Sequence, residues 1–407
     1  MSHIPVIFLH GWAGDLESYG KLPELLLKED FKLEHIHLGH YTASDDALGI
    51  DDYALALNRA VRDKGIHQPF DVIVHSTGVL VVRSWLTHFF KPTDRSPIRN
   101  FIMVAPANNG SRLAGWGKKL PWDWGNKILD ALQLGSHYTW ELNWEWLRTQ
   151  RHKNMPGLKI YQILGAKNDL VFPGFLEKFD EMLGINVPAF EEEGSDNTIR
   201  FCAANLNMRA TRLEVHQKMD QSTIYEINDI PIYAFLDRSH FGDTHGLLGA
   251  IRSNKDPVFK LICDILTDRP LPRPTDLTSL PKKLNYTMLN LRVVDQLGNP
   301  YEDFIPHFYL GDADSRKAIK IAHHAENKEI DCFYIQYKNL SSLQKFGFQI
   351  EKNKVGNAIY RASQYVDLHW PDMGIHFLQE KRTHLLELVI EKVVTEKAMQ
   401  FEYPRVK

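Results

Sequence analysis

Ser76 lies at the apex of a predicted tight bend, and its surroundings favour nucleophilic chemistry. Residues 71–74 are rich in β-branched side chains, and the segment after Gly78 is apolar and compatible with a helix. A strand, a bend and a helix in this order predict a nucleophile elbow, which lifts the serine hydroxyl above the sheet. The usual pattern is G-x-S-x-G, and here Val74 replaces the first glycine. A Ser-Thr turn without chemistry is the alternative, so other parts of the chain must decide.

The pair His10-Gly11 follows the predicted first strand at 6–9. A His-Gly pair at this place commonly shapes the second half of an oxyanion hole, using a backbone N–H just after the glycine. Trp12 or Ala13 would supply that N–H. Thr77, at the start of the helix after the elbow, would supply the other. A plain glycine turn is the alternative interpretation.

A serine needs a histidine base, and the chain order in elbow-type hydrolases is serine, acid, histidine. The base is therefore expected after the last strand of the sheet, where His240 and His245 both lie. We prefer His245, because it directly precedes Gly246, which opens an apolar segment predicted to be helical. His240 is the alternative base.

Two aspartates compete for the role of the acid. Asp169 follows a clear strand, whereas Asp196 lies in Gly194-Ser195-Asp196 and is closer in sequence to the histidines. Local chemistry does not decide between them. A metal site built on His35, His37 and His40 is a weaker possibility, because alternation along a strand would place His35 and His37 on one face with no acidic partner nearby. We therefore expect neither a metal nor a cofactor.

Strand and helix patterns alternate through the first part of the chain, which predicts a parallel sheet covered on both faces. Ligands in such sheets bind beyond the carboxyl ends of the strands, so His10, Ser76 and the loop 105–111 are expected to converge. The predicted strands are 6–9, 33–38, 71–74, 101–104, 158–164 and 231–236, and the predicted closing helices are 247–253 and 257–266.

Tryptophans gather between residues 111 and 150, a segment with few strand signals. We interpret it as a helical cap over the site, whose amphipathic rings could face acyl chains or a membrane interface. Packing of the cap onto the core is the alternative. The candidate substrate-facing residues are Trp116, Trp122, Trp124 and Trp140.

Composition divides the chain into two domains. Residues 1–267 form the predicted catalytic α/β domain, 268–282 are a proline-rich linker, and 283–407 are predicted to form a β-rich, sandwich-like domain of alternating strands. The net charge of −3 argues against a nucleic-acid binder. The three cysteines are widely spaced and indicate a reducing compartment. We see neither a signal peptide nor a membrane-spanning segment, so we expect a cytoplasmic or peripherally membrane-associated protein.

With these residues placed, the first 260 residues resemble the PlaB-type bacterial phospholipases A/lysophospholipases. The resemblance rests on His10-Gly11-Trp12, Ser18-Tyr19-Gly20 with Leu22-Pro23, His37-Leu38-Gly39 with Tyr41, and His75-Ser76-Thr77-Gly78. It implies an α/β-hydrolase domain followed by a β-rich domain. It also implies Ser76 as nucleophile, Asp196 in preference to Asp169 as acid, and a base closest in spacing to His245.

The resemblance further implies hydrolysis of ester bonds in phospholipids and lysophospholipids, contact with bacterial membranes and homo-oligomer formation. Two alternatives stay open. One is a triacylglycerol lipase or general carboxylesterase of the same fold. The other is a non-enzymatic scaffold of hydrolase fold that binds a membrane or a partner.

Overall fold

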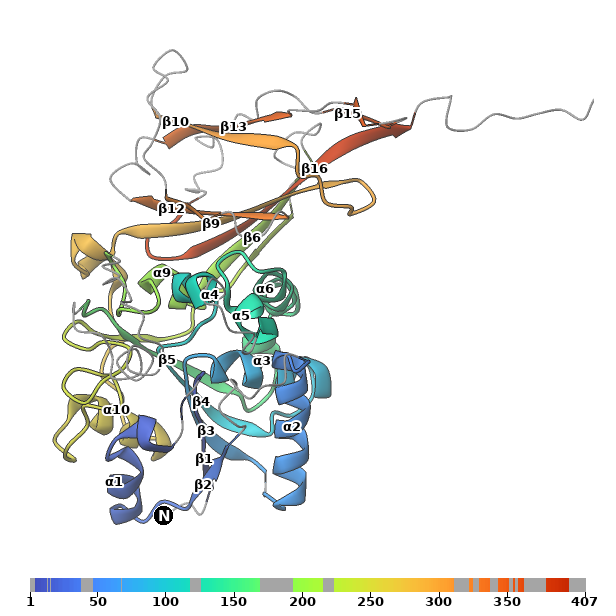
Figure 1. Ribbon diagram of the computed structural model, residues 1–407. Helices are drawn as coiled ribbons and strands as arrows, with labels where there is room; N and C mark the ends of the chain where they lie inside the picture. The colour runs from blue at the N-terminus through green and yellow to red at the C-terminus, as the bar shows by residue number, and fades with distance from the viewer. Residues whose placement is uncertain are drawn as a thin grey trace, which may run out of the picture.

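The computed structural model describes residues 4–12, 14, 16–37, 47–66, 68–117, 126–168, 193–214, 223–310, 322–324, 329–336, 343–350, 354–355, 358–361 and 378–394. Two large sheets with helices between them, and a separate pair of strands, form most of this part of the molecule (Figure 1).

The first sheet has six strands in the order β2-β1-β3-β4-β5-β8, and every pairing in it is parallel. The strand order reverses between β1 and β3, and ligand sites in open α/β sheets lie at such a point. The predicted strands are confirmed, with small differences in their ends. The strands are β1 (Val6–Leu9), β2 (Leu33–Ile36), β3 (Phe70–His75), β4 (Ile98–Val104), β5 (Lys159–Gly165) and β8 (Ile232–Phe235).

Helices cover both faces of this sheet, as the strand–helix alternation predicts (Figure 1). Successive side chains of β1 enter different cores: Phe8 packs with α1 and α10, whereas Ile7 and Leu9 pack with α2 and α3. Burial on both faces explains why β1 is apolar throughout. The covering helices are α1 (Leu22–Lys28), α2 (Ile50–Asp63), α3 (Gly78–Phe89) and α10 (Pro257–Leu266), and a 3-10 turn, η1 (Leu16–Tyr19), precedes α1.

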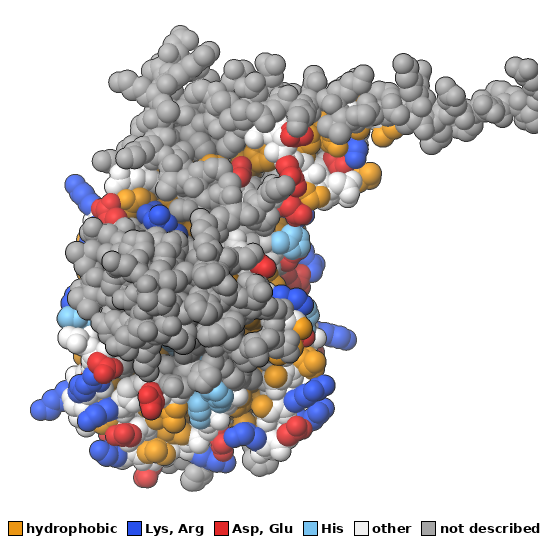
Figure 2. Space-filling view, in the orientation of Figure 1, with side chains coloured by type: hydrophobic (Ala, Val, Ile, Leu, Met, Phe, Trp, Pro, Cys, Tyr) orange, Lys and Arg blue, Asp and Glu red, His pale blue; other side chains and the backbone are white. Residues whose placement is uncertain are grey.

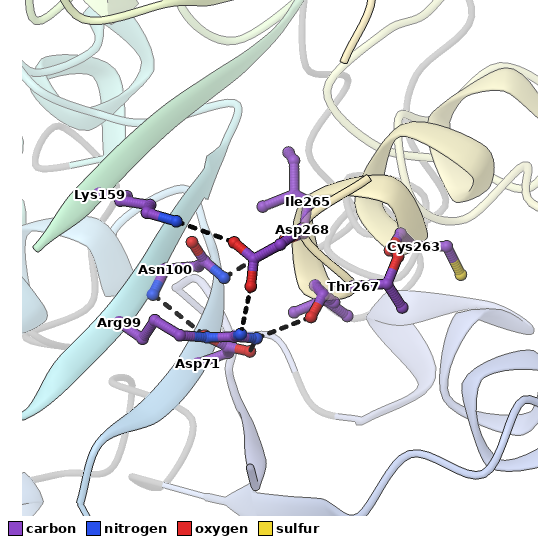
Figure 3. Close-up of polar contacts among 9 residues, drawn as sticks. Asp71, Arg99, Asn100, Lys159, Cys263, Ile265, Thr267 and Asp268 are labelled. Carbon is purple, nitrogen blue, oxygen red and sulfur yellow. Dashed lines mark hydrogen bonds and ion pairs between the residues drawn. The ribbon is translucent and has the colours of Figure 1, made fainter. Parts of the chain in front are cut away.

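An ionic cluster that is buried at Asp71 and exposed at Lys159 and Asp268 connects α10 to the amino ends of the central strands (Figure 3). Arg99 of β4 donates through Nε and Nη2 to both oxygens of Asp71 on β3, and through Nη1 to Asp268, just after α10. Arg99 Nη2 also donates to the carbonyl of Leu266 in the last turn of α10. Lys159 of β5 completes the cluster with a hydrogen bond to Asp268. This cluster lies at the opposite end of the strands from Ser76.

The segment expected to form a cap is helical where it is described: α4 (Arg112–Gly117), α5 (Asn126–Leu132), α6 (His137–Thr149) and α7 (Arg151–Asn154). It lies between the two sheets (Figure 1), and Glu141 of α6 forms an ion pair with Arg292 of the second sheet. Trp140 is only 2% exposed and stacks on Trp144 within the core. For Trp140 the packing interpretation is therefore the correct one. Trp122 and Trp124 lie outside the described residues, and of Trp116 the structure describes only the backbone, within α4.

The second sheet is mixed and contains eight strands among the described residues, with a separate two-stranded sheet beside it. Most of these strands are predicted from the alternating pattern after residue 283. The eight are β6 (Met208–Glu214), β7 (Thr223–Glu226), β9 (Tyr286–Asp295), β11 (Ala322–His324), β12 (Ile330–Gln336), β14 (Lys354–Val355), β15 (Ala358–Arg361) and β16 (Thr383–Val394), and the pair is β10 (Phe304–Leu310) with β13 (Leu343–Ile350). Short elements α9 (Phe201–Ala204), η3 (Leu277–Ser279) and η4 (Lys282–Leu284) lie between the sheets' strands in sequence.

Two strands of this second sheet come from before the proline-rich segment. β6 pairs in parallel with β16, and β7 pairs with the other edge of β6. The sheet therefore crosses the predicted boundary at 267, while the division into two domains stays a prediction. The sequence reasoning missed β6 because its charged residues, Arg209, Arg212 and Glu214, interrupt the apolar pattern.

The predicted helix at 247–253 is wrong, because this segment forms turns instead. Gly246 and Gly249 both lie against the backbone carbonyl of Gly242, where an added Cβ would come within 2.4 Å and 2.7 Å of the carbonyl oxygen. Because both residues lack a side chain, the segment can fold back on the loop that precedes it. This difference bears directly on the choice of base.

Candidate active site

Ser76 occupies a strained bend between β3 and α3, as the elbow prediction requires. Its φ angle is +53°, a left-handed conformation that is uncommon for a residue with a side chain and is found at functional turns. The Ser76 N–H donates to the carbonyl of Val104 at 3.0 Å, which ties the bend to the end of β4. The side chain is 6% exposed, so the hydroxyl is sheltered from bulk water.

Two glycines make room for this bend. A Cβ on Gly78 would lie 2.6 Å from the carbonyl oxygen of His10, so α3 can start close to β1 only without a side chain there. A Cβ on Gly11 would lie 2.8 Å from the Cβ of Ser76. The His10-Gly11 turn therefore lies directly against the serine, as predicted from its position after β1.

His240, not His245, is the histidine beside Ser76. The Ser76 hydroxyl donates to His240 Nε2 at 3.0 Å, and His240 Nδ1–H donates to the Asp196 carboxylate at 2.8 Å. The imidazole is 1% exposed, and both of its nitrogens have partners in this chain of hydrogen bonds. A serine, a histidine and an aspartate connected in this way can activate the serine hydroxyl for attack on a carbonyl.

Our preference for His245 is therefore not supported by the geometry. It depended on a helix that would start at Gly246, and that helix does not form. Ser239 and Gly246 instead form a β-bridge, and the Ser239 N–H donates to the His245 carbonyl at 2.8 Å. This closes a loop in which His240 follows one bridged residue and His245 precedes the other, and only His240 reaches Ser76, while His245 is half-buried.

Asp196 lies at the position that the acid of such an arrangement needs. Its Oδ1 accepts hydrogen bonds from the N–H groups of Thr198 at 3.1 Å and Ile199 at 2.9 Å, while Oδ2 accepts from His240. The Asp196 carbonyl also accepts from the His240 N–H at 2.8 Å. The competing candidate, Asp169, lies outside the described residues.

His75, which precedes the serine, is a buried neighbour of His240 that the sequence reasoning did not assign. Its ring lies 4.9 Å from that of His240, and His75 Nε2–H donates to the His240 carbonyl at 3.3 Å. Burial, followed by the proximity of His240 and His10, holds the pKa of His75 well below its usual value of 6.5. His75 is therefore neutral at physiological pH. Its place in His75-Ser76-Thr77-Gly78 was the signal that could have identified it.

Two of the expected oxyanion-hole residues, Thr77 and Trp12, are described by the structure. Thr77 is buried at the start of α3, and its N–H has no hydrogen-bond acceptor among the described residues. A helix start leaves such N–H groups available for a negative charge. Trp12 directly follows the glycine that contacts Ser76 and is half-buried, whereas Ala13 lies outside the described residues. The role of these groups stays a prediction.

Elsewhere the described surface offers few signs of a second kind of site. In the face that Figure 2 shows, acidic and basic side chains are interspersed over the described surface, in keeping with a net charge of −3. Within the described ranges no three His, Cys, Asp or Glu side chains are arranged to hold a metal ion. None of the helices in these ranges combines the length and apolar character needed to cross a membrane.

Comparison with known proteins agrees with the fold that carries this site. A family model described as the alpha/beta hydrolase fold matches residues 4–182. The structure is similar to phospholipase PlaB from Legionella pneumophila in complex with thio-NAD, with 24% sequence identity and a TM-score of 0.78 over 99% of this chain and 97% of that one. A second structure of the same phospholipase gives 22% identity and a TM-score of 0.77 over 100% and 97% of the two chains. No curated protein matched the sequence.

These findings show that the chain has the α/β-hydrolase fold followed by a second, mixed sheet. The resemblance to the PlaB-type enzymes that the sequence indicates is confirmed at the level of the fold, over nearly the full length of both chains. The fold and the family model together support a hydrolase function.

Proposed function

We propose that this chain is a serine hydrolase that cleaves carboxylic ester bonds of phospholipids and lysophospholipids. The observation that carries the proposal is the hydrogen-bonded chain from Ser76 through His240 to Asp196, with the serine in a strained bend at the carboxyl end of β3. These three side chains come from three separate loops. A stable fold does not require them to be aligned, so their alignment supports a catalytic role.

The proposed reaction has two halves. Ser76 Oγ attacks the acyl carbonyl as His240 Nε2 takes the hydroxyl proton, and Asp196 stabilises the resulting imidazolium. His240 then gives the proton to the leaving alcohol, which leaves an acyl-serine and releases a lysophospholipid from a phospholipid or a glycerophosphodiester from a lysophospholipid. Water, activated by the same histidine, cleaves the acyl-serine and releases the fatty acid.

Backbone N–H groups would stabilise the negative charge that develops on the acyl oxygen. We assign this role to Thr77 and to Trp12 or Ala13, because the first starts α3 and the second pair follows the glycine against Ser76. Removing one such donor typically costs about 10²- to 10³-fold in kcat. The base in this proposal is His240, which replaces the residue that we preferred from the sequence.

The lipid substrate class rests on a different observation, the full-length similarity to a bacterial phospholipase. This similarity, together with the sequence motifs of the resemblance, favours a phospholipid over another ester. The geometry of the triad does not distinguish between these substrates. Peripheral membrane contact and homo-oligomer formation, both implied by the same resemblance, are part of the proposal.

The substitution Ser76→Ala tests the proposal directly. We expect it to abolish release of fatty acid from lysophosphatidylcholine and phosphatidylcholine while circular dichroism and the melting temperature stay unchanged. Ser253→Ala, at an exposed serine, is the matched control and should retain full activity. Fatty-acid release by the Ser76→Ala protein would contradict the mechanism.

A substrate panel separates the proposal from its alternatives. We expect lysophospholipid and phospholipid to be hydrolysed faster than triacylglycerol or short nitrophenyl esters. A reversed order would favour a lipase or a general carboxylesterase that uses the same three residues. Absence of hydrolysis with every ester would favour a non-enzymatic scaffold.

A further inference from the structure

The loop that carries Asp196 is closed on itself. Ser195 and Arg200 form an antiparallel β-bridge, and the Phe201 N–H donates to the Gly194 carbonyl at 2.9 Å. Inside this loop the Asp196 N–H donates to the Ile199 carbonyl at 3.2 Å. Because the ends are fixed to each other, the position of the carboxylate depends on what holds the loop as a whole.

Arg200, the residue that closes this loop, places its guanidinium group against two tyrosine rings of the second sheet. The Arg200 Cζ atom lies 4.4 Å from the ring centre of Tyr286 and 4.1 Å from that of Tyr334. Arginine favours such stacking because its planar cation is attracted to aromatic faces. Arg200 is only 9% exposed, so little water weakens these contacts.

The two tyrosines lie on the face of the second sheet that is turned towards the acid loop. Tyr334 of β12 pairs with Met288 of β9, two residues from Tyr286, so both rings project from the same face of neighbouring strands. Tyr334 and Met288 belong to the core shared with the hydrolase part, whereas Leu289 and Phe333, next to them in sequence, belong to a separate core on the other face. The tyrosines therefore point towards the acid loop.

The start of the loop contacts the same part of the sheet. The hydroxyl of Tyr286 donates to the Glu193 carboxylate at 2.7 Å. Gly194 has a φ angle of +81°, and a Cβ there would lie 2.8 Å from the Lys283 carbonyl oxygen and 3.1 Å from the Tyr286 ring. Both ends of the acid loop thus contact tyrosines of the second sheet, while Asp196 within the loop contacts His240.

We propose that Arg200 is a positioning residue of the active site, through which the second sheet holds Asp196 against His240. This inference rests on the proposed function, since it assigns Asp196 a part in catalysis. It gives the second sheet a role in the reaction without requiring any of its residues to touch substrate. Misplacing a catalytic group by about 1 Å can cost about 10²-fold in rate.

Steady-state kinetics of Arg200 variants test the proposal. For Arg200→Ala we expect a loss of about 10²-fold in kcat on lysophosphatidylcholine with little change in KM. Arg200→Lys keeps the charge but loses the planar stack, so it should fold more readily and show a smaller loss. Lys392→Ala is the matched control, because Lys392 forms a cation–π contact with Tyr360 elsewhere in the same sheet, and it should leave kcat unchanged.

A double-mutant cycle decides whether Arg200 acts through Asp196. In an Asp196→Asn background, Arg200→Ala should have little further effect on kcat, because the group that it positions is already lost. Equal losses in both backgrounds would show a general structural role and overturn the proposal. So would an unchanged kcat in the single variant.

The low-field proton NMR signal of His240 Nδ1–H provides a readout that does not need turnover. We expect Arg200→Ala to shift or broaden this signal, which can be assigned by its loss in His240→Asn. An unchanged signal would overturn the positioning role. If the wild-type protein hydrolyses no ester, the proposed function fails, but this signal still decides whether Arg200 holds Asp196 against His240.

Discussion

Hydrogen bonding at the level of single residues distinguishes the two candidate bases. His240 uses Nδ1 for Asp196 and Nε2 for Ser76, so its ring has one orientation and one tautomer suited to accepting the serine proton. His245 lies only five positions further along the chain, on the other side of a closed loop. The path of the backbone between the two histidines therefore determines which of them reaches Ser76.

Substitution of the two histidines gives contrasting expected results. His240→Asn should lower kcat for ester hydrolysis by about 10⁴-fold or more, because the general base is lost. His245→Asn, the matched control, should retain activity within a few-fold. Initial rates of fatty-acid release from lysophosphatidylcholine would measure both. A larger loss in the His245 variant would restore the preference that we drew from the sequence.

The residues of the candidate site differ in how well the sequence predicts their roles. Ser76 could be located because the elbow leaves a local pattern of strand, bend and glycine. Asp196 followed from the resemblance and not from local chemistry. The base could not be chosen, because that choice depended on whether residues 247–253 form a helix. The structure of this segment depends on the packing of Gly246 and Gly249 against Gly242, which the sequence pattern does not reveal. The contacts of Arg200 with two tyrosines distant in sequence leave no local pattern.

At the scale of elements, the amino and carboxyl ends of the strands have separate tasks. The carboxyl ends carry Ser76 and the loops around it, while the amino ends are fastened to α10 by the Arg99 cluster (Figure 3). Asp71 is almost completely buried, and burial raises its pKa even though the hydrogen bond and charge of Arg99 lower it. The hydrogen bond from Arg99 thus compensates a carboxylate that is otherwise costly to bury.

Removing Arg99 should therefore destabilise the fold without affecting the site. Arg99→Met leaves Asp71 buried without its cation and is expected to lower the free energy of unfolding by about 3–5 kcal/mol. Lys159→Met, at the exposed pair with Asp268, should cost no more than about 1 kcal/mol. Chemical denaturation would measure both values. Equal stability of the two variants would contradict this account of the cluster.

The strands of the first sheet and their parallel arrangement followed from the sequence, because apolar runs alternate with helical patterns. The second sheet did not, since β16 is flanked by β9 from its own half of the chain and by β6 from the other. Pairing between segments so far apart, with charged residues in β6, has no local signature. The sequence pattern therefore predicted most of the strands but not which of them are neighbours.

For the whole molecule, two buried histidines make the stability depend on pH. His75 beside the site and His384 in β16 are both nearly inaccessible. Burial, together with nearby Arg209, lowers the pKa of His384 to about 3, and its Nε2 accepts a hydrogen bond from the Gln379 N–H at 2.8 Å. In the unfolded chain each imidazole binds a proton below about pH 6.5, whereas in the folded protein both stay neutral.

The unfolded state thus takes up more protons, so stability is complete above pH 6.5 and is lost as the pH falls. Each histidine contributes a slope that approaches about 1.4 kcal/mol per pH unit below 6.5. His384→Gln should reduce the slope of the unfolding free energy between pH 6 and 5 by about this amount. Urea denaturation across that range would measure it, and an unchanged slope would show that His384 is protonated in the folded protein.

The central claim is that Ser76, activated by His240, is a reactive nucleophile, and covalent labelling tests it most directly. A fluorophosphonate probe should add to Ser76 of the wild-type protein, as peptide mass spectrometry would show. Labelling should be absent in Ser76→Ala, much slower in His240→Asn and unchanged in His245→Asn. Absence of an adduct on Ser76 of the folded wild-type protein, or an adduct on another serine that accounts for its activity, would contradict the claim.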